Sequence, residues 1–235
     1  MNFEDIKYNW RKISEIISRR ESECGRLSRP VRIVPVSKTH PYEVIKWGME
    51  AGIRIFGENY VQELCEKQES ASREGLLPEW HFIGHLQTNK VKYIAPFVSM
   101  IHSVDSLHLA EEISKQAEKC GRTIDILLQV NSSGEQSKSG CEPEAIFDLY
   151  EQVSKLSNLS LKGLMTIGSF SYDEEVYRGE FRLMKRLLDE LNERFPEAKL
   201  NELSMGMSGD FEAAIEEGST MVRIGTAIFG ERDYR

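Results

Sequence analysis

Apolar residues in the first part of the chain recur at the spacing of an amphipathic helix. Five of them follow one another at steps of three and four residues: Phe3, Ile6, Trp10, Ile13 and Ile17. Gly25 and then Pro30 end this pattern, because glycine is favoured just after a helix and proline cannot continue one. We therefore expect a helix over residues 3–24 that precedes the rest of the fold.

Eight short apolar runs follow, each of a length and composition typical of a buried strand. They lie at residues 32–36, 54–56, 80–83, 100–103, 124–130, 161–166, 202–204 and 221–224. Helical patterns lie between them, at residues 41–51, 60–74, 88–95, 106–120, 142–156, 174–195 and 211–217. This alternation predicts parallel strands joined by helical crossovers. Eight such units favour an α/β fold closed into a single (β/α)8 TIM barrel, and an open doubly wound sheet is the alternative.

The length of the chain fits one such barrel. Its 235 residues include no linker and no low-complexity segment. We expect one domain overall, with the N-terminal helix in residues 1–26 and the barrel in residues 27–235. The chain continues for about ten residues after the last predicted strand, which leaves room for a short closing helix.

Composition excludes several classes of function. The 30 basic and 38 acidic residues give a formal net charge of −8, which disfavours nucleic acid as a partner. The amino terminus is charged and no run of about 18 apolar residues occurs, so we expect no membrane partner and a cytoplasmic protein. The four cysteines form no C-x-x-C pair and are expected to be free thiols rather than metal ligands: Cys24, Cys65, Cys120 and Cys141.

Small residues follow the last two predicted strands, where barrels of this type commonly bind phosphate. The segment from Ser204 to Asp210 reads Ser-Met-Gly-Met-Ser-Gly-Asp, and Gly225-Thr-Ala follows the final strand. Both segments lead into short helices and would present free backbone N–H groups to an anion. These glycines also fit ordinary turns, and that interpretation stays open at this point.

Arg223 favours the anion site. It lies on the last predicted strand, two residues before Gly225, and is expected to point into the barrel. A buried guanidinium requires an anion or an acceptor nearby. A structural carboxylate would serve equally well, so the arginine alone does not decide between a ligand and a salt bridge.

Lys38 follows the first predicted strand, in Val36-Ser-Lys-Thr-His-Pro41, and therefore belongs to the same end of the barrel. Most lysines at strand ends are solvated surface charges. Pyridoxal 5'-phosphate (PLP), however, is the cofactor that combines a phosphate anchor with a lysine imine. A partly desolvated position near other cations would favour the neutral amine that such an imine needs.

Two further patterns have simpler interpretations. His81 and His85 lie four residues apart, but Gly84 interrupts the element and no third ligand is evident, so a structural or pocket-lining role is favoured over a metal site. The Gly/Ser-rich segment 131–140 lacks the Walker spacing. We interpret it as a mobile loop over the barrel mouth, with Lys138 as a weak candidate ligand contact.

Six blocks of the chain, taken in order, resemble the pyridoxal-phosphate homeostasis protein family. They are Pro35-Val-Ser-Lys38, Phe56-Gly-Glu-Asn-Tyr60-Val-Gln-Glu63, Trp80-His-Phe-Ile-Gly-His-Leu-Gln-Thr-Asn-Lys90, Gly163-Leu-Met-Thr166, Leu203-Ser-Met-Gly-Met-Ser208 and Val222-Arg-Ile-Gly-Thr226. The match extends from about residue 30 to the C-terminus. It implies the PLP fold type III barrel that this family shares with the N-terminal domain of alanine racemase.

The resemblance also implies roles for individual residues. Lys38 lies where the family forms its Schiff base with PLP, and Arg223 lies where a guanidinium faces the pyridine nitrogen. The phosphate would be bound at Ser208, Gly225 and Thr226. Asn59 and Met207 match residues that line the ring of the cofactor.

The implied function is storage, buffering or delivery of PLP without efficient catalysis. An arginine beside the pyridine nitrogen keeps that nitrogen unprotonated and weakens the ring as an electron sink. Tyr60 and Tyr234 could supply an acid–base group, but neither matches such a role in the family. Candidate partners are PLP-dependent apoenzymes, and we expect a monomer. A weak racemase or lyase, and a metal- or phosphosugar-dependent barrel enzyme without PLP, are the alternatives.

Overall fold

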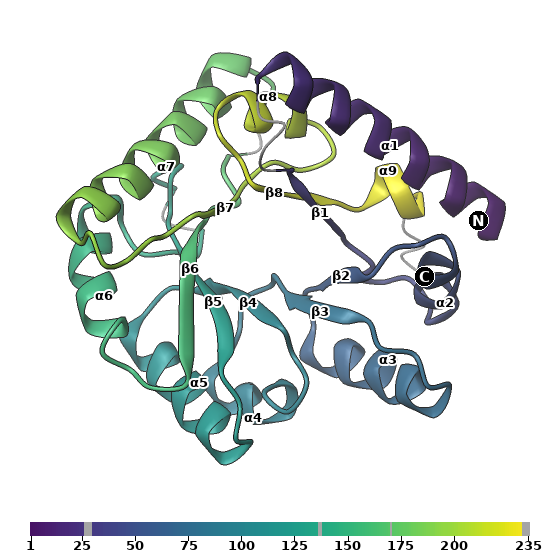
Figure 1. Cartoon of the computed structure of the whole chain (residues 1–235), viewed down its shortest axis with the longest axis horizontal. Helices are drawn as coiled ribbons and strands as arrows, with labels where there is room; N and C mark the ends of the chain where they lie inside the picture. The colour runs from purple at the N-terminus through teal and green to yellow at the C-terminus, as the bar shows by residue number, and fades with distance from the viewer. Residues whose placement is uncertain (26–29, 136–137, 170, 232–235) are drawn as a thin grey trace.

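Eight parallel strands form a nearly closed barrel in the computed structural model, which describes residues 1–25, 30–135, 138–169 and 171–231. The strands are β1 (Arg32–Pro35), β2 (Ile55–Glu58), β3 (Glu79–Phe82), β4 (Met100–Val104), β5 (Ile124–Gln129), β6 (Leu159–Met165), β7 (Glu202–Ser204) and β8 (Met221–Ile224). Neighbours pair in the order β1-β8-β7-β6-β5-β4-β3-β2. Figure 1 shows the helices arranged around the outside of this ring. The predicted (β/α)8 barrel is confirmed.

Two contacts between β1 and β2 bring the ring close to closure. Val36 forms a parallel bridge with Gly57, and the Ser37 N–H donates to the Gly57 carbonyl at 3.1 Å. The strands approach closely here, since a Cβ on Gly57 would lie only 3.0 Å from Val34 Cγ1. Strands β1 and β2 are the two ends of the paired order, and an open sheet would keep its edge strands apart, so the open doubly wound alternative is wrong.

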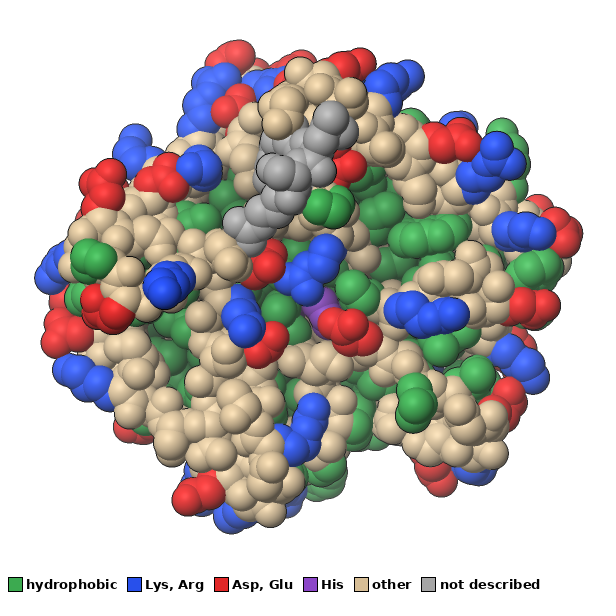
Figure 2. All heavy atoms as spheres, viewed as in Figure 1, with side chains coloured by type: hydrophobic (Ala, Val, Ile, Leu, Met, Phe, Trp, Pro, Cys, Tyr) green, Lys and Arg blue, Asp and Glu red, His purple; other side chains and the backbone are tan. Residues whose placement is uncertain are grey.

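Helices alternate with the strands as the sequence predicts. They are α1 (Phe3–Glu23), α2 (Glu43–Glu50), α3 (Val61–Arg73), α4 (Val91–Ile94), α5 (Leu107–Lys119), α6 (Ile146–Val153), α7 (Glu174–Arg194), α8 (Phe211–Glu216) and α9 (Thr226–Phe229). Single 3₁₀ turns at Thr88–Lys90 and Pro143–Ala145 precede α4 and α6. Within the described ranges, no helix combines the length and apolar character that a membrane crossing needs. Figure 2 shows basic and acidic side chains interspersed over one face of the molecule.

The first helix packs on the outside of the barrel, against the first helix of the repeat and the last two helices. Asn2 and Asp5 form a reciprocal capping box that satisfies free N–H groups at the start of α1. The helix packs against α2, α8 and α9, and Figure 1 shows it lying along α9. The Asn9 side chain donates to the Ile228 carbonyl at 3.1 Å, and Arg20 pairs with Glu212 at 2.6 Å. Helix α1 is therefore docked on the barrel through both apolar and polar contacts.

The core has two parts. The larger part fills the layer between the strands and the surrounding helices. A smaller cluster contains five apolar side chains from strands of the barrel: Val34, Met100, Leu127, Met165 and Met221. Two histidines, His81 on β3 and His102 on β4, are also fully buried. Burial lowers the pKa of both imidazoles, so both are neutral in the folded barrel.

This burial predicts that acid destabilises the fold. Below the ordinary histidine pKa of about 6.5, the unfolded chain binds a proton at each imidazole that the folded chain excludes. Stability is therefore complete above pH 6.5 and falls as the pH drops below it, by up to about 1.4 kcal/mol per pH unit for each histidine. Urea unfolding at pH 7.5 and pH 5.5 measures this slope. His102→Asn should reduce the slope, whereas His108→Asn, on the exposed surface of α5, should leave it unchanged; equal slopes in both variants would contradict the prediction.

Candidate functional site

The turns after β1, β7 and β8 lie side by side at one end of the barrel. Strand β1 pairs with β8 so that Pro35 faces Ile224, and the Val36 N–H donates to the Ile224 carbonyl at 2.9 Å. On the other side of β8, the Arg223 N–H donates to the Gly206 carbonyl at 2.9 Å. The turn that bears Lys38 is therefore next to the turn at Gly225. The segment after β7 lies on the other side of the Gly225 turn.

A tight turn holds Lys38 at the end of β1. The His40 N–H donates to the Ser37 carbonyl at 3.1 Å, and Thr39 adopts the left-handed backbone conformation with φ of 65°. Few non-glycine residues adopt this conformation without support from their surroundings. Here the Thr39 N–H donates to Glu63 Oε1 at 2.6 Å. Lys38 itself is half-buried, so its amine is partly withdrawn from water.

A buried ion pair lies directly beneath this turn and was not predicted. The Lys67 ammonium donates to Glu58 Oε1, to Glu63 Oε1 and to the Ser37 carbonyl, each at 2.7 Å. The Ser37 hydroxyl donates to the same Glu58 oxygen at 2.6 Å. Both Glu58 and Lys67 are buried. Burial raises the pKa of the Glu58 carboxyl, and the Lys67 ammonium opposes this effect. The network fixes the backbone immediately before Lys38.

Arg223 is a buried cation held by neutral acceptors. Its Nη1 donates to Ser204 Oγ and its Nη2 to the Thr166 carbonyl, both at 2.7 Å. Burial lowers the pKa of the guanidinium to about 10, and the charge of Asp210 opposes this. Within the described residues no carboxylate forms an ion pair with Arg223. The structural salt bridge that the sequence left open is therefore not formed there, and the buried charge remains available to a ligand acceptor.

The two small-residue segments present hydroxyl and N–H groups at the same place. Thr226 Oγ1 lies 3.4 Å from Ser208 Oγ. In the part of the chain that the structure describes, the backbone N–H groups of Ser208, Gly209 and Thr226 donate to no other residue. The Met207 N–H, by contrast, donates to Asp210 Oδ1 at 2.5 Å, which tightens the turn before α8. Unpaired donors grouped in this way suit an anion.

Asn59 and Met207 lie in the segments that follow β2 and β7. Asn59 follows β2, the neighbour of β1, and its buried Oδ1 has no hydrogen-bond partner among the residues that the structure describes. A buried carbonyl oxygen without a partner is unfavourable unless a ligand or water satisfies it. Asn59 also lines a cavity of about 640 Å³ together with Tyr60, His85 and Lys90. Met207 is half-buried in the segment after β7.

The other residues singled out in the sequence have partners of their own. His81 is buried and bonded to Glu79, whereas His85 is exposed and lies 4.0 Å from Asp105. The Lys138 ammonium pairs with Glu135 at 3.2 Å and also donates to the Gly168 carbonyl. Residues 136–137 of the predicted mobile loop, and Tyr234, lie outside the described residues.

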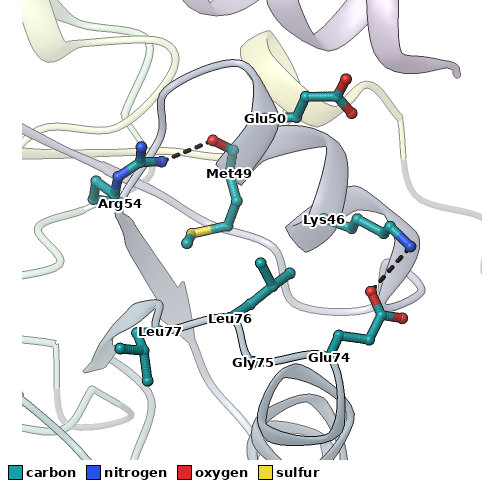
Figure 3. Close-up of a pocket in the computed structure, with 8 residues that line it drawn as sticks. All are labelled: Lys46, Met49, Glu50, Arg54, Glu74, Gly75, Leu76 and Leu77. Carbon is teal, nitrogen blue, oxygen red and sulfur yellow. Dashed lines mark hydrogen bonds and ion pairs between the residues drawn. The ribbon is translucent and has the colours of Figure 1, made fainter.

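A separate hollow of about 510 Å³ illustrates a site whose charges are already satisfied. It lies between the end of α2, the start of β2 and the turn after α3, at the end of the barrel where strands begin. Figure 3 shows Arg54 directed at the Met49 carbonyl, at 2.7 Å, and Lys46 at Glu74, at 2.9 Å. Lys46 is therefore paired with a carboxylate in this hollow, and Arg54 is bonded to a backbone carbonyl.

Comparisons with known proteins agree with the fold. Residues 1–233 match the family described as alanine racemase, N-terminal domain. A pyridoxal phosphate homeostasis protein of Aquifex aeolicus is 46% identical over 226 residues, which cover 95% of this chain and 98% of that protein. This chain belongs to the pyridoxal phosphate homeostasis protein family. The resemblance inferred from the six sequence blocks is thereby confirmed.

Solved structures extend the comparison. PipY of Synechococcus elongatus, a structure with PLP bound, is 34% identical with a TM-score of 0.80, and the match covers 91% of this chain and 100% of PipY. Alanine racemase of Clostridium difficile is 16% identical with a TM-score of 0.78, covering 97% of this chain and 57% of the racemase. At that identity the racemase supports the shared barrel fold alone.

Proposed function

We propose that this chain binds PLP at the turns after β1, β7 and β8 and serves to store, buffer or deliver it. The observation that supports this most strongly is Arg223, a buried cation without a carboxylate partner among the described residues. Position 223 is also in register with Val34, four residues before Lys38. The Lys38 amine and the Arg223 guanidinium therefore belong to neighbouring segments at the same end of the barrel.

The residues present fit this cofactor. When bound, PLP supplies an aldehyde that can form a Schiff base with a lysine amine, and we assign that lysine as Lys38. The hydroxyls of Ser208 and Thr226, with the backbone of Gly225, would hold the phosphate. Arg223 would donate to the pyridine nitrogen with N–H groups not used by Ser204 and Thr166, since guanidinium offers five. Asn59 and Met207 would contact the ring.

The same arginine argues against efficient catalysis by this protein. A guanidinium can only donate a hydrogen bond, so the pyridine nitrogen that accepts it stays unprotonated. The ring then withdraws electrons less effectively than it would opposite a carboxylate. We therefore propose a carrier that passes PLP to PLP-dependent apoenzymes rather than a racemase.

Assays of amino-acid racemisation and of PLP transfer distinguish a racemase from a PLP carrier. Purified PLP-loaded protein is incubated first with single enantiomers of amino acids and then, in a separate assay, with a PLP-dependent apoenzyme. We expect no sustained racemisation and a recovery of apoenzyme activity that follows the amount of loaded protein added. Sustained racemisation that Lys38→Ala abolishes would establish the enzyme instead.

The phosphate cradle gives a further prediction. Ser208→Ala combined with Thr226→Ala removes two donors to a dianionic group, each worth roughly a factor of ten in affinity. We expect the double variant to bind PLP on the order of 10- to 100-fold more weakly in equilibrium dialysis while Lys38 remains able to react. Ser72→Ala with Thr123→Ala, at exposed positions far from these turns, is the matched control. Equal retention by both double variants would remove the two hydroxyls from the site.

A further inference from the structure

A line of buried polar groups connects Arg223 with the opposite end of the barrel. Arg223 Nη1 lies 2.7 Å from Ser204 Oγ, and Ser204 Oγ lies 3.0 Å from His102 Nδ1. His102 Nε2 lies 3.0 Å from His81 Nδ1, and His81 Nε2 lies 3.0 Å from Glu79 Oε1. The five residues come from β8, β7, β4 and β3. The proposed cofactor site uses only the first of them directly.

The chemistry of Glu79 fixes the direction of the hydrogen bonds in this line. Its carboxylate only accepts, so a neutral His81 bears its proton on Nε2 and its Nδ1 accepts from His102 Nε2. A neutral His102 then has an unprotonated Nδ1, which accepts from the Ser204 hydroxyl. Arginine only donates, so Ser204 accepts from Arg223 while its own hydrogen is directed to His102. The Glu79 end therefore requires this pair of tautomers, and the Arg223 end is compatible with it.

The surroundings keep both imidazoles neutral. Burial is the main cause of the lowered pKa of each, and Arg223 and Arg32 lower that of His102 further. Arg32 is itself paired with Glu202 at 2.9 Å, and Asp125 near His81 lies 3.5 Å from Lys162. The hydrogen bond from His81 lowers the pKa of Glu79, whose side chain is 45% exposed, so Glu79 is ionised at neutral pH. A cation at one end is thus connected to an anion at the other.

We propose that Ser204, His102, His81 and Glu79 form a one-directional hydrogen-bond chain that positions Arg223 for its ligand. Ser204 can accept from Arg223 in a fixed orientation only while its hydrogen is directed to His102. The aligned bonds polarise one another, so the charge of Glu79 reinforces each of them. The guanidinium is held without being neutralised by a direct carboxylate contact, which preserves its interaction with an acceptor at the barrel mouth. The ligand part of this inference rests on the proposed function.

The tautomers provide a test that does not involve PLP. Nitrogen-15 NMR of imidazole-labelled, cofactor-free protein at pH 7.5 reports the protonation of each ring nitrogen. We expect protonated Nε2 and unprotonated Nδ1 in both His81 and His102. A proton on Nδ1 of either ring, or a doubly protonated ring, would overturn the proposed direction of the chain.

Substitutions test the effect on ligand binding. His102→Leu removes the acceptor for Ser204, and we expect PLP binding weakened roughly tenfold or more, because the constraint on a charged donor is lost. His102→Asn can place an amide oxygen near the former Nδ1, and we expect it to restore most of the affinity. His108→Leu, on the exposed surface, should bind PLP like the unaltered protein.

The readout is the dissociation constant for PLP, with circular dichroism to establish that each variant is folded. A folded His102→Leu variant that binds PLP as tightly as the unaltered protein would overturn the positioning role. If His102→Leu fails to fold, two other results test the positioning role. They are the dissociation constant of His102→Asn for PLP, compared with that of the unaltered protein, and the tautomer measurement. Failure of the unaltered protein to bind PLP would instead refute the proposed function, while the tautomer result would stand by itself.

Discussion

Lys38→Ala is expected to lose all covalently held PLP. The side chain follows β1 beside the turns that contain Gly225 and Thr226, and we assign no other lysine to this position. Without the amine the cofactor can bind only through its phosphate and ring contacts. The visible absorbance of loaded protein should therefore disappear, and dialysis should remove PLP that the unaltered protein retains.

The controls separate the chemistry of the amine from its charge. Lys38→Arg keeps a cation in the turn but cannot form an imine, so it should behave like Lys38→Ala. Lys46→Ala removes an amine that pairs with Glu74 at the other end of the barrel and should retain the absorbance. A Lys38→Ala protein that keeps both its absorbance and its resistance to dialysis would contradict the assignment.

Lys67→Met is expected to cause the largest loss of stability. The substitution leaves Glu58 buried without its cation, and breaking a buried ion pair in this way typically costs about 3–5 kcal/mol. The turn before Lys38 also loses the hydrogen bond to the Ser37 carbonyl, so PLP binding should weaken as well. Urea unfolding at pH 7.5 measures the change in the free energy of unfolding.

A double-mutant cycle tests whether Glu58 and Lys67 stabilise the fold as a pair. Glu58→Gln combined with Lys67→Met removes both charges, and the double variant should be more stable than Lys67→Met alone, because no unpaired charge remains. Lys155→Met breaks an exposed pair with Glu151 and should change the free energy of unfolding by no more than about 0.5 kcal/mol. Strictly additive effects of the two buried substitutions would show that Glu58 and Lys67 are not coupled.

Most of the fold was predictable because strands and helices differ in hydrophobic periodicity. The predicted strand at residues 221–224 and the helix at 3–24 agree with β8 and α1 to within one residue. Strand β2 was predicted at 54–56 but continues through Gly57 to Glu58. A glycine and a charged residue resemble the end of a strand in sequence. Here Gly57 permits close approach to Val34, and Glu58 is stabilised by a lysine nine residues away.

The positions of Lys38 and Arg223 at one end of the barrel were predictable, because both residues lie at or just after the C-terminal ends of strands that share one face. Their roles toward PLP stay predictions. The line of groups from Ser204 to Glu79 was missed, since His102 and Ser204 are 102 residues apart and meet only across the closed barrel. Lys67 resembled an ordinary surface lysine of an amphipathic helix. The spacing of Glu63 and Lys67, four residues apart, was the one available signal, and it is common on exposed helices.

The proposed PLP site requires that the Lys38 amine and a phosphate cradle face each other over one barrel mouth. Borohydride reduction of PLP-loaded protein, followed by proteolysis and mass spectrometry of the peptides, locates the modified lysine. We expect a single pyridoxyl group on Lys38, in the peptide that contains Val36-Ser-Lys-Thr-His40. Modification of Lys67 or Lys138 in place of Lys38, or no modification of any lysine, would contradict it.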